Sequence, residues 1–143
     1  MTIVTETARD RLERAKEASR QIGLLSDAAK AELLRAMADA IEHESDAIVT
    51  ANADDLQRGE TDEIGAGLLD RLRLDHPRIQ ALADALRAVA VLPDPVGRIL
   101  DERVLDNGVV LQKVSVPFGV IGSNYEARPN VTVDIAALAL RSG

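Results

Sequence analysis

Residues 116–134 read VPFGVIGSNYEARPNVTVD, and this stretch decides how the rest of the chain is interpreted. It contains Phe118 and Tyr125, the only phenylalanine and the only tyrosine of the chain. The apolar pair at 120–121 predicts a short buried strand, a polar loop follows, and residues 131–141 have the apolar pattern of a helix that packs against a sheet. Strand, loop and helix in this order build ligand sites in α/β proteins. We therefore expect the chemistry of the protein at this loop.

The chain before this stretch predicts helices, because apolar residues recur at helical spacing between capping and breaking residues. Ser26 and Asp75 are good N-caps, and Gly59 is expected to interrupt the third helix. The predicted helices cover 4–22, 27–43, a segment beginning near 44 or 45, a short segment around 64–72, and 76–91.

A hairpin is predicted around Asp106-Asn107-Gly108, which separates β-rich runs at 98–105 and 109–116. Asn-Gly suits a two-residue turn in which both residues have positive φ. Polar residues fall on both faces of the second run, so it makes a poor independent core strand. Two interpretations stay open: an extended arm covered by another part of the protein or another subunit, or a solvent-facing hairpin.

Composition excludes several function classes. The chain has 143 residues, a formal net charge of −7 and no cysteine, which argues against nucleic acid or anionic membrane partners and rules out disulfides and thiolate chemistry within it. The two histidines, His43 and His76, lie far apart, so no metal site is expected. No apolar run reaches the roughly 18 residues that span a bilayer, and a cytoplasmic protein is the simplest expectation.

The α/β part of the predicted fold is incomplete. A parallel βαβ unit needs a second strand after its crossover helix, whereas this sequence stops at Gly143. We therefore expect a fragment of a longer protein. The alternative, a small complete helical domain with a hairpin, would leave the apolar helix at 131–141 with little to cover it.

Arg128 is the most informative residue of the central loop. It precedes a predicted helix N-terminus, where free N–H groups, the helix dipole and a guanidinium together suit a phosphate or carboxylate. The plain alternative is a surface salt bridge, for instance to Glu126. Asn130 has two readings as well, an N-cap of the helix or an amide donor to an oxyanion. Tyr125 either lines a cofactor pocket or packs.

The residues from Lys113 to Gly143, and above all the run YEARPNVTVD at 125–134, closely resemble gamma-glutamyl phosphate reductase, also called glutamate-5-semialdehyde dehydrogenase. The segments ANADD at 51–55 and LDRL at 69–72 resemble the helical N-terminus of the same family. The resemblance covers all 143 residues but only about the first third of a family member.

The resemblance implies an α/β fold of the aldehyde-dehydrogenase superfamily. Residues 1–97 would then form an N-terminal helical region, residues 98–116 a β-hairpin oligomerisation arm, and residues 117–143 the start of an incomplete, Rossmann-like NADP-binding domain. The resemblance also implies that the full-length protein forms a homo-oligomer through this arm.

The resemblance also implies NADPH-dependent reduction of L-glutamyl 5-phosphate, a small acyl phosphate, to L-glutamate 5-semialdehyde plus phosphate in proline biosynthesis. By this resemblance Arg128 is the first choice for the substrate anion or oxyanion and Asn130 the second. The residues expected beside the nicotinamide are Ser123, Asn124, Tyr125 and Glu126. The family's cysteine nucleophile is absent here, so the chain alone is expected to be inactive; a non-catalytic oligomerisation or partner-binding module is the alternative.

Overall fold

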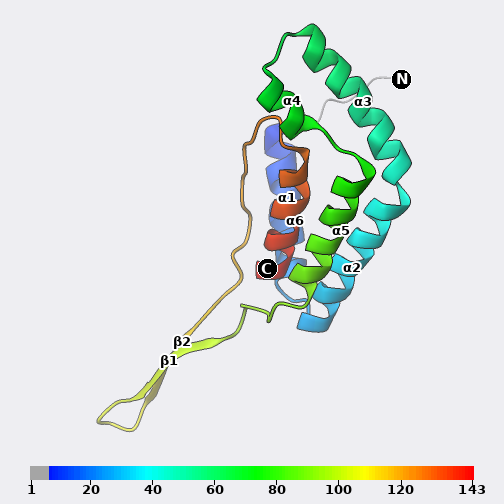
Figure 1. Ribbon diagram of the computed structural model, residues 1–143. Coiled ribbons are helices and arrows are strands. Elements are labelled where there is room, and N and C mark those ends of the chain that lie inside the picture. The colour runs from blue at the N-terminus through cyan, green and yellow to red at the C-terminus, as the bar shows by residue number, and fades with distance from the viewer. Residues whose placement is uncertain (1–6) are drawn as a thin grey trace.

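The computed structural model describes residues 7–143, which form six helices and one two-stranded antiparallel sheet (Figure 1). The helices are α1 (Ala8–Ile22), α2 (Asp27–His43), α3 (Ser45–Thr61), α4 (Ala66–Leu72), α5 (His76–Ala90) and α6 (Pro129–Ser142), and the strands are β1 (Ile99–Val104) and β2 (Val110–Val114). The hairpin projects away from the helical bundle as a long arm (Figure 1). Within the described residues, no helix is long and apolar enough to cross a membrane.

The helix starts follow from local side-chain chemistry. The side chain of Ser26 accepts the backbone N–H of Ala29 at 3.2 Å, and that of Asp75 accepts the N–H of Arg78 at 2.9 Å, so both predicted N-caps are confirmed. The first helix begins at Ala8. The part of the predicted helix that covers residues 4–6 lies outside the described residues.

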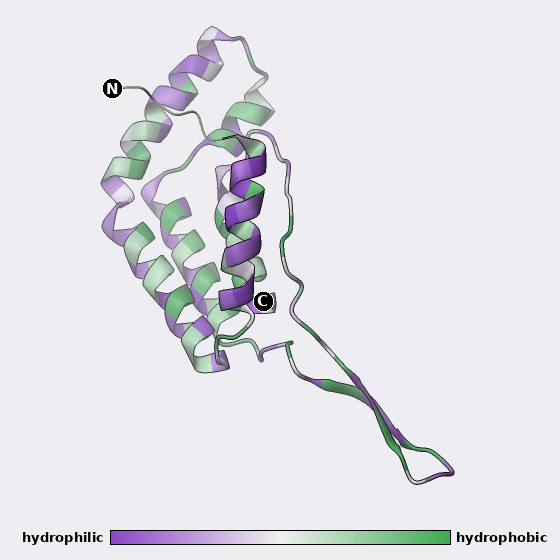
Figure 2. Ribbon diagram, turned by 180° about the vertical axis from the view of Figure 1, so that it is seen from behind, coloured by the Kyte–Doolittle hydropathy of each residue, from purple (hydrophilic) through white to green (hydrophobic). Residues whose placement is uncertain are grey.

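The core lies where α5 packs against α2 on one side and α6 on the other. Its side chains are mostly small, because the chain has almost no aromatic residues to fill a wider space. The buried cluster consists of Ala31, Leu34, Ala38, Ala83, Leu86, Ala90 and Ala137. Figure 2 shows hydrophobic turns in green and hydrophilic turns in purple along the helices of the bundle.

The prediction that Gly59 interrupts the third helix is wrong, because α3 runs through this residue to Thr61. Gly59 is buried, and a Cβ built on it would lie only 2.8 Å from Cδ1 of Ile64 and 3.0 Å from Cδ2 of Leu69. The glycine is therefore explained by packing, since its missing side chain lets the following segment fold back onto the helix.

The hairpin is present, but its turn differs from the predicted two-residue type. Gly108 has a φ of 84°, whereas Asn107 is not among the residues with positive φ. The N–H of Gly108 donates to the carbonyl of Leu105 at 2.8 Å, and the N–H of Leu105 donates to the carbonyl of Val109 at 2.9 Å. This is a three-residue loop that closes with glycine in the left-handed region.

Both strands of the hairpin are exposed at every residue. They pair with each other from Val104 and Val110 at the tip side to Ile99 and Val114 at the base. Among the described residues, this hairpin is therefore solvent-facing, with exposed valines and leucines along its length. Whether another subunit covers it stays a prediction.

The predicted buried strand at 120–121 is wrong. This segment has no strand pairing, and Val120 and Ile121 are 44% and 45% exposed. A buried strand needs a neighbouring strand, and the described residues provide none beside this segment. The chain just before it lies against the end of α6 instead, where the N–H of Gly119 donates to the carbonyl of Gly143 at 2.8 Å.

The last helix also differs from its prediction, because α6 packs on the helices α5 and α2 and not on a sheet. Arg141, 5% exposed, anchors it: its guanidinium donates to the carbonyl of Leu92 and lies 2.5 Å from Oδ1 of Asp27. Leu138 on the outer face stays 57% exposed, so only part of this apolar helix is covered by the described chain.

Candidate functional site

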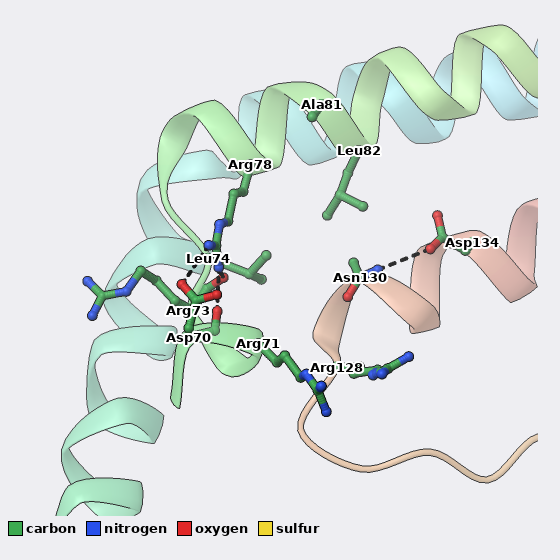
Figure 3. Close-up of a pocket in the computed structure, with 10 residues that line it drawn as sticks. All are labelled: Asp70, Arg71, Arg73, Leu74, Arg78, Ala81, Leu82, Arg128, Asn130 and Asp134. Atoms are coloured by element: carbon green, nitrogen blue, oxygen red, sulfur yellow. Dashed lines mark hydrogen bonds and ion pairs between the residues drawn. The ribbon is translucent and has the colours of Figure 1, made fainter. Parts of the chain in front are cut away.

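Arg128 occupies the N-cap position of α6, with Pro129 as the first helical residue and Asn130 as the second. No side chain caps this helix, so the predicted N-cap role of Asn130 is wrong. Pro129 explains the shift, because proline has a fixed φ and no N–H and is favoured at the first helical position. The amide of Asn130 donates instead to Oδ2 of Asp134 at 3.2 Å, one turn further along (Figure 3).

The loop that leads into α6 has a constrained backbone. Ala127, next to Arg128, has a φ of 47°, a left-handed conformation that residues with a Cβ adopt at a cost. The hydroxyl of Tyr125 lies 2.6 Å from Oγ1 of Thr132, which joins the loop to the first turns of the helix. Together these features fix the direction in which the chain enters α6 and hence the place of Arg128.

The turn between α4 and α5 faces this helix end, and Arg78 holds it from one side. The guanidinium of Arg78 donates to the carbonyl of Arg73 at 2.9 Å and to the carboxylate of Asp70 at 2.8 Å, and also to the carbonyl of Asp70. One side chain of α5 therefore fixes the last turn of α4 and the residue that follows it.

Asn52 of α3 holds the same turn from the inside. Its amide donates to the carbonyl of Leu72 at 2.9 Å and accepts the N–H of Leu74 at 2.7 Å, and only 4% of the residue is exposed. Buried amides that are satisfied on both sides rigidify the backbone they bind. The turn is thus fixed by two independent side chains.

A cavity of about 480 Å³ lies between this turn, the first half of α5 and the start of α6. Arg71, Arg73 and Arg128 all line the cavity. Arg71 extends from α4 toward the start of α6, where Arg128 lies (Figure 3). Asn130 and Asp134 line the helix side of the cavity, and Leu82 lies on the α5 side.

Four arginines and two aspartates line the cavity, and Asp70 pairs with Arg78. Within residues 7–143, neither Arg71 nor Arg128 has an ion-pair or hydrogen-bond partner for its guanidinium, so the predicted alternative of a salt bridge to Glu126 is not observed. The N-terminal end of a fourteen-residue helix adds its dipole at the same place. The arrangement suits an anionic ligand.

The four residues predicted beside a nicotinamide are all exposed: Ser123, Asn124, Tyr125 and Glu126. They precede Arg128 in the sequence, in the loop that leads into α6. None of them lines the cavity. The backbone N–H groups of residues 120–127 have no acceptor among the described residues, which leaves this loop open for a ligand or another part of a protein to lie against.

A second polar cluster carries no comparable site. The hydroxyl of Ser45 lies 2.8 Å from Nδ1 of His76, whose Nε2 lies 3.6 Å from the carboxylate of Asp46. These residue types match a nucleophile, a base and an orienting acid, but none of the three lines a described cavity. The contact joins the start of α3 to the start of α5. No group of acidic, histidine or cysteine residues in the described chain is arranged to hold a metal ion.

Arg71 was not among the residues predicted to form the site. Its signal in the sequence is weak, since an arginine near the end of a short helix is usually a solvated charge. Only the fold, which brings residues 71 and 128 to one cavity, shows that it belongs with Arg128.

No protein-family model matches the chain. Two solved structures share its fold, one from Thermotoga maritima with a TM-score of 0.90 and 32% identity, and one from Saccharomyces cerevisiae with a TM-score of 0.88 and 29% identity. The matched regions comprise 94% and 95% of this chain, and 32% and 35% of the two solved chains. The fold is therefore that of a segment of a reductase.

Both solved proteins are gamma-glutamyl phosphate reductases, and so are the sequence relatives. The protein of Kineococcus radiotolerans is 54% identical over 142 residues, which cover 99% of this chain and 33% of that protein. The protein of Xanthomonas campestris pv. campestris is 52% identical over 128 residues, 90% of this chain and 31% of that protein. The resemblance to this family is confirmed, and the chain spans about a third of the length of the relatives it matches.

Proposed function

We propose that this chain is part of a gamma-glutamyl phosphate reductase. In that enzyme it would form the side of the active site that binds the anionic substrate. The reaction is the NADPH-dependent reduction of L-glutamyl 5-phosphate to L-glutamate 5-semialdehyde with release of phosphate, the second step of proline biosynthesis from glutamate. The observation that carries the proposal is 54% identity over 99% of the chain to a reductase of that name. A biosynthetic enzyme of this kind is expected in the cytoplasm.

Arg128 is the residue proposed to meet the reacting end of the substrate. An acyl phosphate carries negative charge on phosphate, and its carbonyl oxygen gains charge when a nucleophile adds to it. A guanidinium without a partner at a helix N-terminus stabilises both charges, because it offers a fork of N–H donors with a fixed positive charge. Asn130 is the second choice, since its amide already donates to Asp134 and has one N–H left.

The loop residues Ser123, Asn124, Tyr125 and Glu126 are proposed to lie beside the nicotinamide half of NADPH. When bound, this cofactor would supply the hydride of the reaction. The exposed loop with unpaired backbone groups is compatible with such a neighbour, and the tether between Tyr125 and Thr132 would hold the loop in a single position against it.

The chain is organised, in this proposal, as a helical region at 1–97, an arm at 98–116 and the start of the NADP-binding domain of an aldehyde-dehydrogenase-like fold at 117–143. The arm would pair protomers into a homo-oligomer, because it exposes apolar residues such as Leu100, Val104 and Val110 along two strands.

The same exposed hairpin favours the second candidate function, a non-catalytic module that associates through its arm. Light scattering coupled to size-exclusion chromatography of the chain and of its Val104→Lys variant tests it. Association that the lysine abolishes would support a binding role for the arm, and a monomer in both samples would exclude the arm as a self-association surface.

The chain contains no cysteine, so the family's thiolate nucleophile has to come from residues outside these 143. We therefore expect no reductase activity from the chain alone. NADPH oxidation by the purified chain with glutamyl phosphate would contradict this.

A hybrid enzyme tests the proposed function directly. In it, this chain replaces the matching 142-residue segment of the Kineococcus radiotolerans reductase, which supplies the remaining two thirds. We expect the hybrid to oxidise NADPH with glutamyl phosphate, and Arg128→Ala to lower kcat by about 10²–10³-fold, as the loss of an oxyanion donor does. Arg35→Ala, at an exposed position of α2 that lines no described cavity, should leave kcat unchanged. An active hybrid whose kcat does not change in Arg128→Ala would show that Arg128 has no role in the reaction.

A further inference from the structure

We propose that Arg71 is a second substrate-binding cation, which binds the carboxylate of the amino-acid end of the substrate while Arg128 binds the reacting end. The proposal rests on the proposed function and adds to it a residue and a division of roles. Its starting point is that two elements distant in sequence, the end of α4 and the start of α6, present one arginine each to a single cavity (Figure 3).

The first support is the lack of any structural task for Arg71. Two other arginines of the bundle are held by acids, Arg78 by Asp70 and Arg87 by Asp39 and Glu42. Arg73 resembles Arg71 in having no acidic partner among the described residues. The guanidinium of Arg71 has no such partner within residues 7–143, although Asp70 is its neighbour in the chain and faces Arg78 instead. An arginine aimed at a cavity and free of internal partners is available to an anion that enters it.

The second support is the rigidity of the backbone that carries Arg71. The turn directly after it is fixed by Asn52, which is 4% exposed and binds both Leu72 and Leu74. Arg78 fixes the preceding residue, Asp70. Two side chains from two other helices thus hold a short, otherwise solvent-facing turn. Such a preorganised backbone lowers the conformational entropy lost when a side chain on it binds a ligand.

The third support is the chemistry of the cavity as a whole. Glutamyl phosphate carries an acyl phosphate at one end and an α-carboxylate with an α-ammonium at the other. Arg128 lies at the helix N-terminus beside the open loop, and Arg71 lies across the cavity from it on a different element. Asp134 lines the same cavity and offers a carboxylate to an ammonium group, with one of its oxygens engaged by Asn130. A volume of about 480 Å³ accommodates a ligand of this size.

Binding of small probes to the chain itself tests the proposal independently of catalysis. We would titrate the 143-residue chain with glutarate and, separately, with inorganic phosphate, and follow the arginine side-chain N–H signals by NMR. Glutarate reports the carboxylate site and phosphate the site of the transferred group. Arg71→Gln should weaken glutarate binding at least fivefold and change phosphate binding less than twofold, and Arg71→Lys should restore part of the glutarate affinity.

Arg35→Gln is the control, because Arg35 is an exposed arginine of α2 that lines no described cavity. It should change neither affinity. Unchanged glutarate binding in Arg71→Gln, an equal loss in Arg35→Gln, or no glutarate binding to the unmodified chain would each overturn the proposal. Circular dichroism of every variant establishes that the bundle is folded.

In the hybrid enzyme, Arg71→Gln should raise KM for glutamyl phosphate about tenfold and lower kcat less than twofold, because a contact to the unreacting end of a substrate acts equally in the ground and transition states. An equal fall of kcat would overturn the division of roles. If even the unmodified hybrid is inactive, the proposed function fails while the probe titrations still decide the role of Arg71.

Discussion

Nζ of Lys30 lies 2.9 Å from Oδ2 of Asp94, and no part of Lys30 is exposed to solvent. The pair joins α2 to the segment between α5 and the arm. Burial raises the pKa of Asp94, but the hydrogen bonds from Lys30 and from the N–H of Val96 outweigh burial, and the pKa lies below its usual value. The base of the arm is thus attached to the bundle by a charged contact.

Replacing Lys30 with alanine should lower the free energy of unfolding by about 3–5 kcal/mol, because it leaves the Asp94 carboxylate without its cation and creates a cavity under α2. Urea denaturation followed by circular dichroism measures the loss. Lys16→Ala on the exposed side of α1 is the control and should change stability by less than about 0.5 kcal/mol. A loss in Lys30→Ala as small as in the control would mean that the buried pair contributes little.

Acid sensitivity should depend on Glu42. The two carboxylate oxygens accept hydrogen bonds from Arg87 at 2.6 and 2.7 Å, and Gln80 donates at 2.6 Å, which lowers the pKa of Glu42 to about 2. A depressed folded-state pKa stabilises the protein above the unfolded value of 4.5, and this stabilisation is lost as pH falls from 4.5 toward 2.

Glu42→Gln should therefore make unfolding easier at pH 7 and flatten the dependence of stability on pH between 4.5 and 2. Thermal melts at half-unit pH steps measure both effects. Glu32→Gln on the same helix, at an exposed position, should leave the profile unchanged. Parallel profiles for Glu42→Gln and the unmodified chain would show that this carboxylate does not couple folding to acid.

The helices could be predicted from the sequence because their signals are local. Ser26 and Asp75 cap the helices they precede, and apolar spacing identifies the buried stripe on α5. The strand at 120–121 could not be predicted correctly, because an apolar pair forms a strand only where a neighbour pairs with it. The hairpin position was predicted but its turn was not, since Asn-Gly fits both a two-residue turn and the three-residue loop that Gly108 closes.

The site was predictable in part. Arg128 was singled out by its place before a helix, and it lines a cavity, but its role toward a substrate stays a prediction. Asn130 is not the N-cap of the helix, because the helix begins one residue earlier, at Pro129. Arg71 could not be found from the sequence, because 57 positions separate it from Arg128 and only the packing of α4, α5 and α6 brings the two together.

Two glycines in helices should respond oppositely to alanine. At Gly67 in α4 an added Cβ meets nothing within 4 Å, so Gly67→Ala should raise the free energy of unfolding by about 0.5–1 kcal/mol through helix propensity. At Gly59 the Cβ would lie 2.8 Å from Ile64, so Gly59→Ala should be destabilising by about 1–3 kcal/mol as the packed side chains move. Urea denaturation of both variants provides the comparison, and equal stabilisation would show that the segment after α3 moves freely.

Ala127 provides the last test, because it sets the approach to Arg128 with a left-handed backbone. Glycine removes the steric cost of this conformation, about 1–2 kcal/mol, but adds unfolded-state entropy worth about 0.4–1 kcal/mol, so Ala127→Gly should raise stability by about 0.5–1 kcal/mol. Ala127→Val should lower it, since a β-branched residue resists positive φ.

The Ala127→Gly variant also distinguishes an effect on stability from an effect on anion binding. A glycine at 127 widens the range of positions that Arg128 samples, and part of the binding free energy is then spent on ordering it. Ala127→Gly should therefore bind inorganic phosphate a few-fold more weakly in the NMR titration while melting at a higher temperature. If phosphate affinity rises together with stability, the strained loop opposes anion binding instead of preparing Arg128 for it.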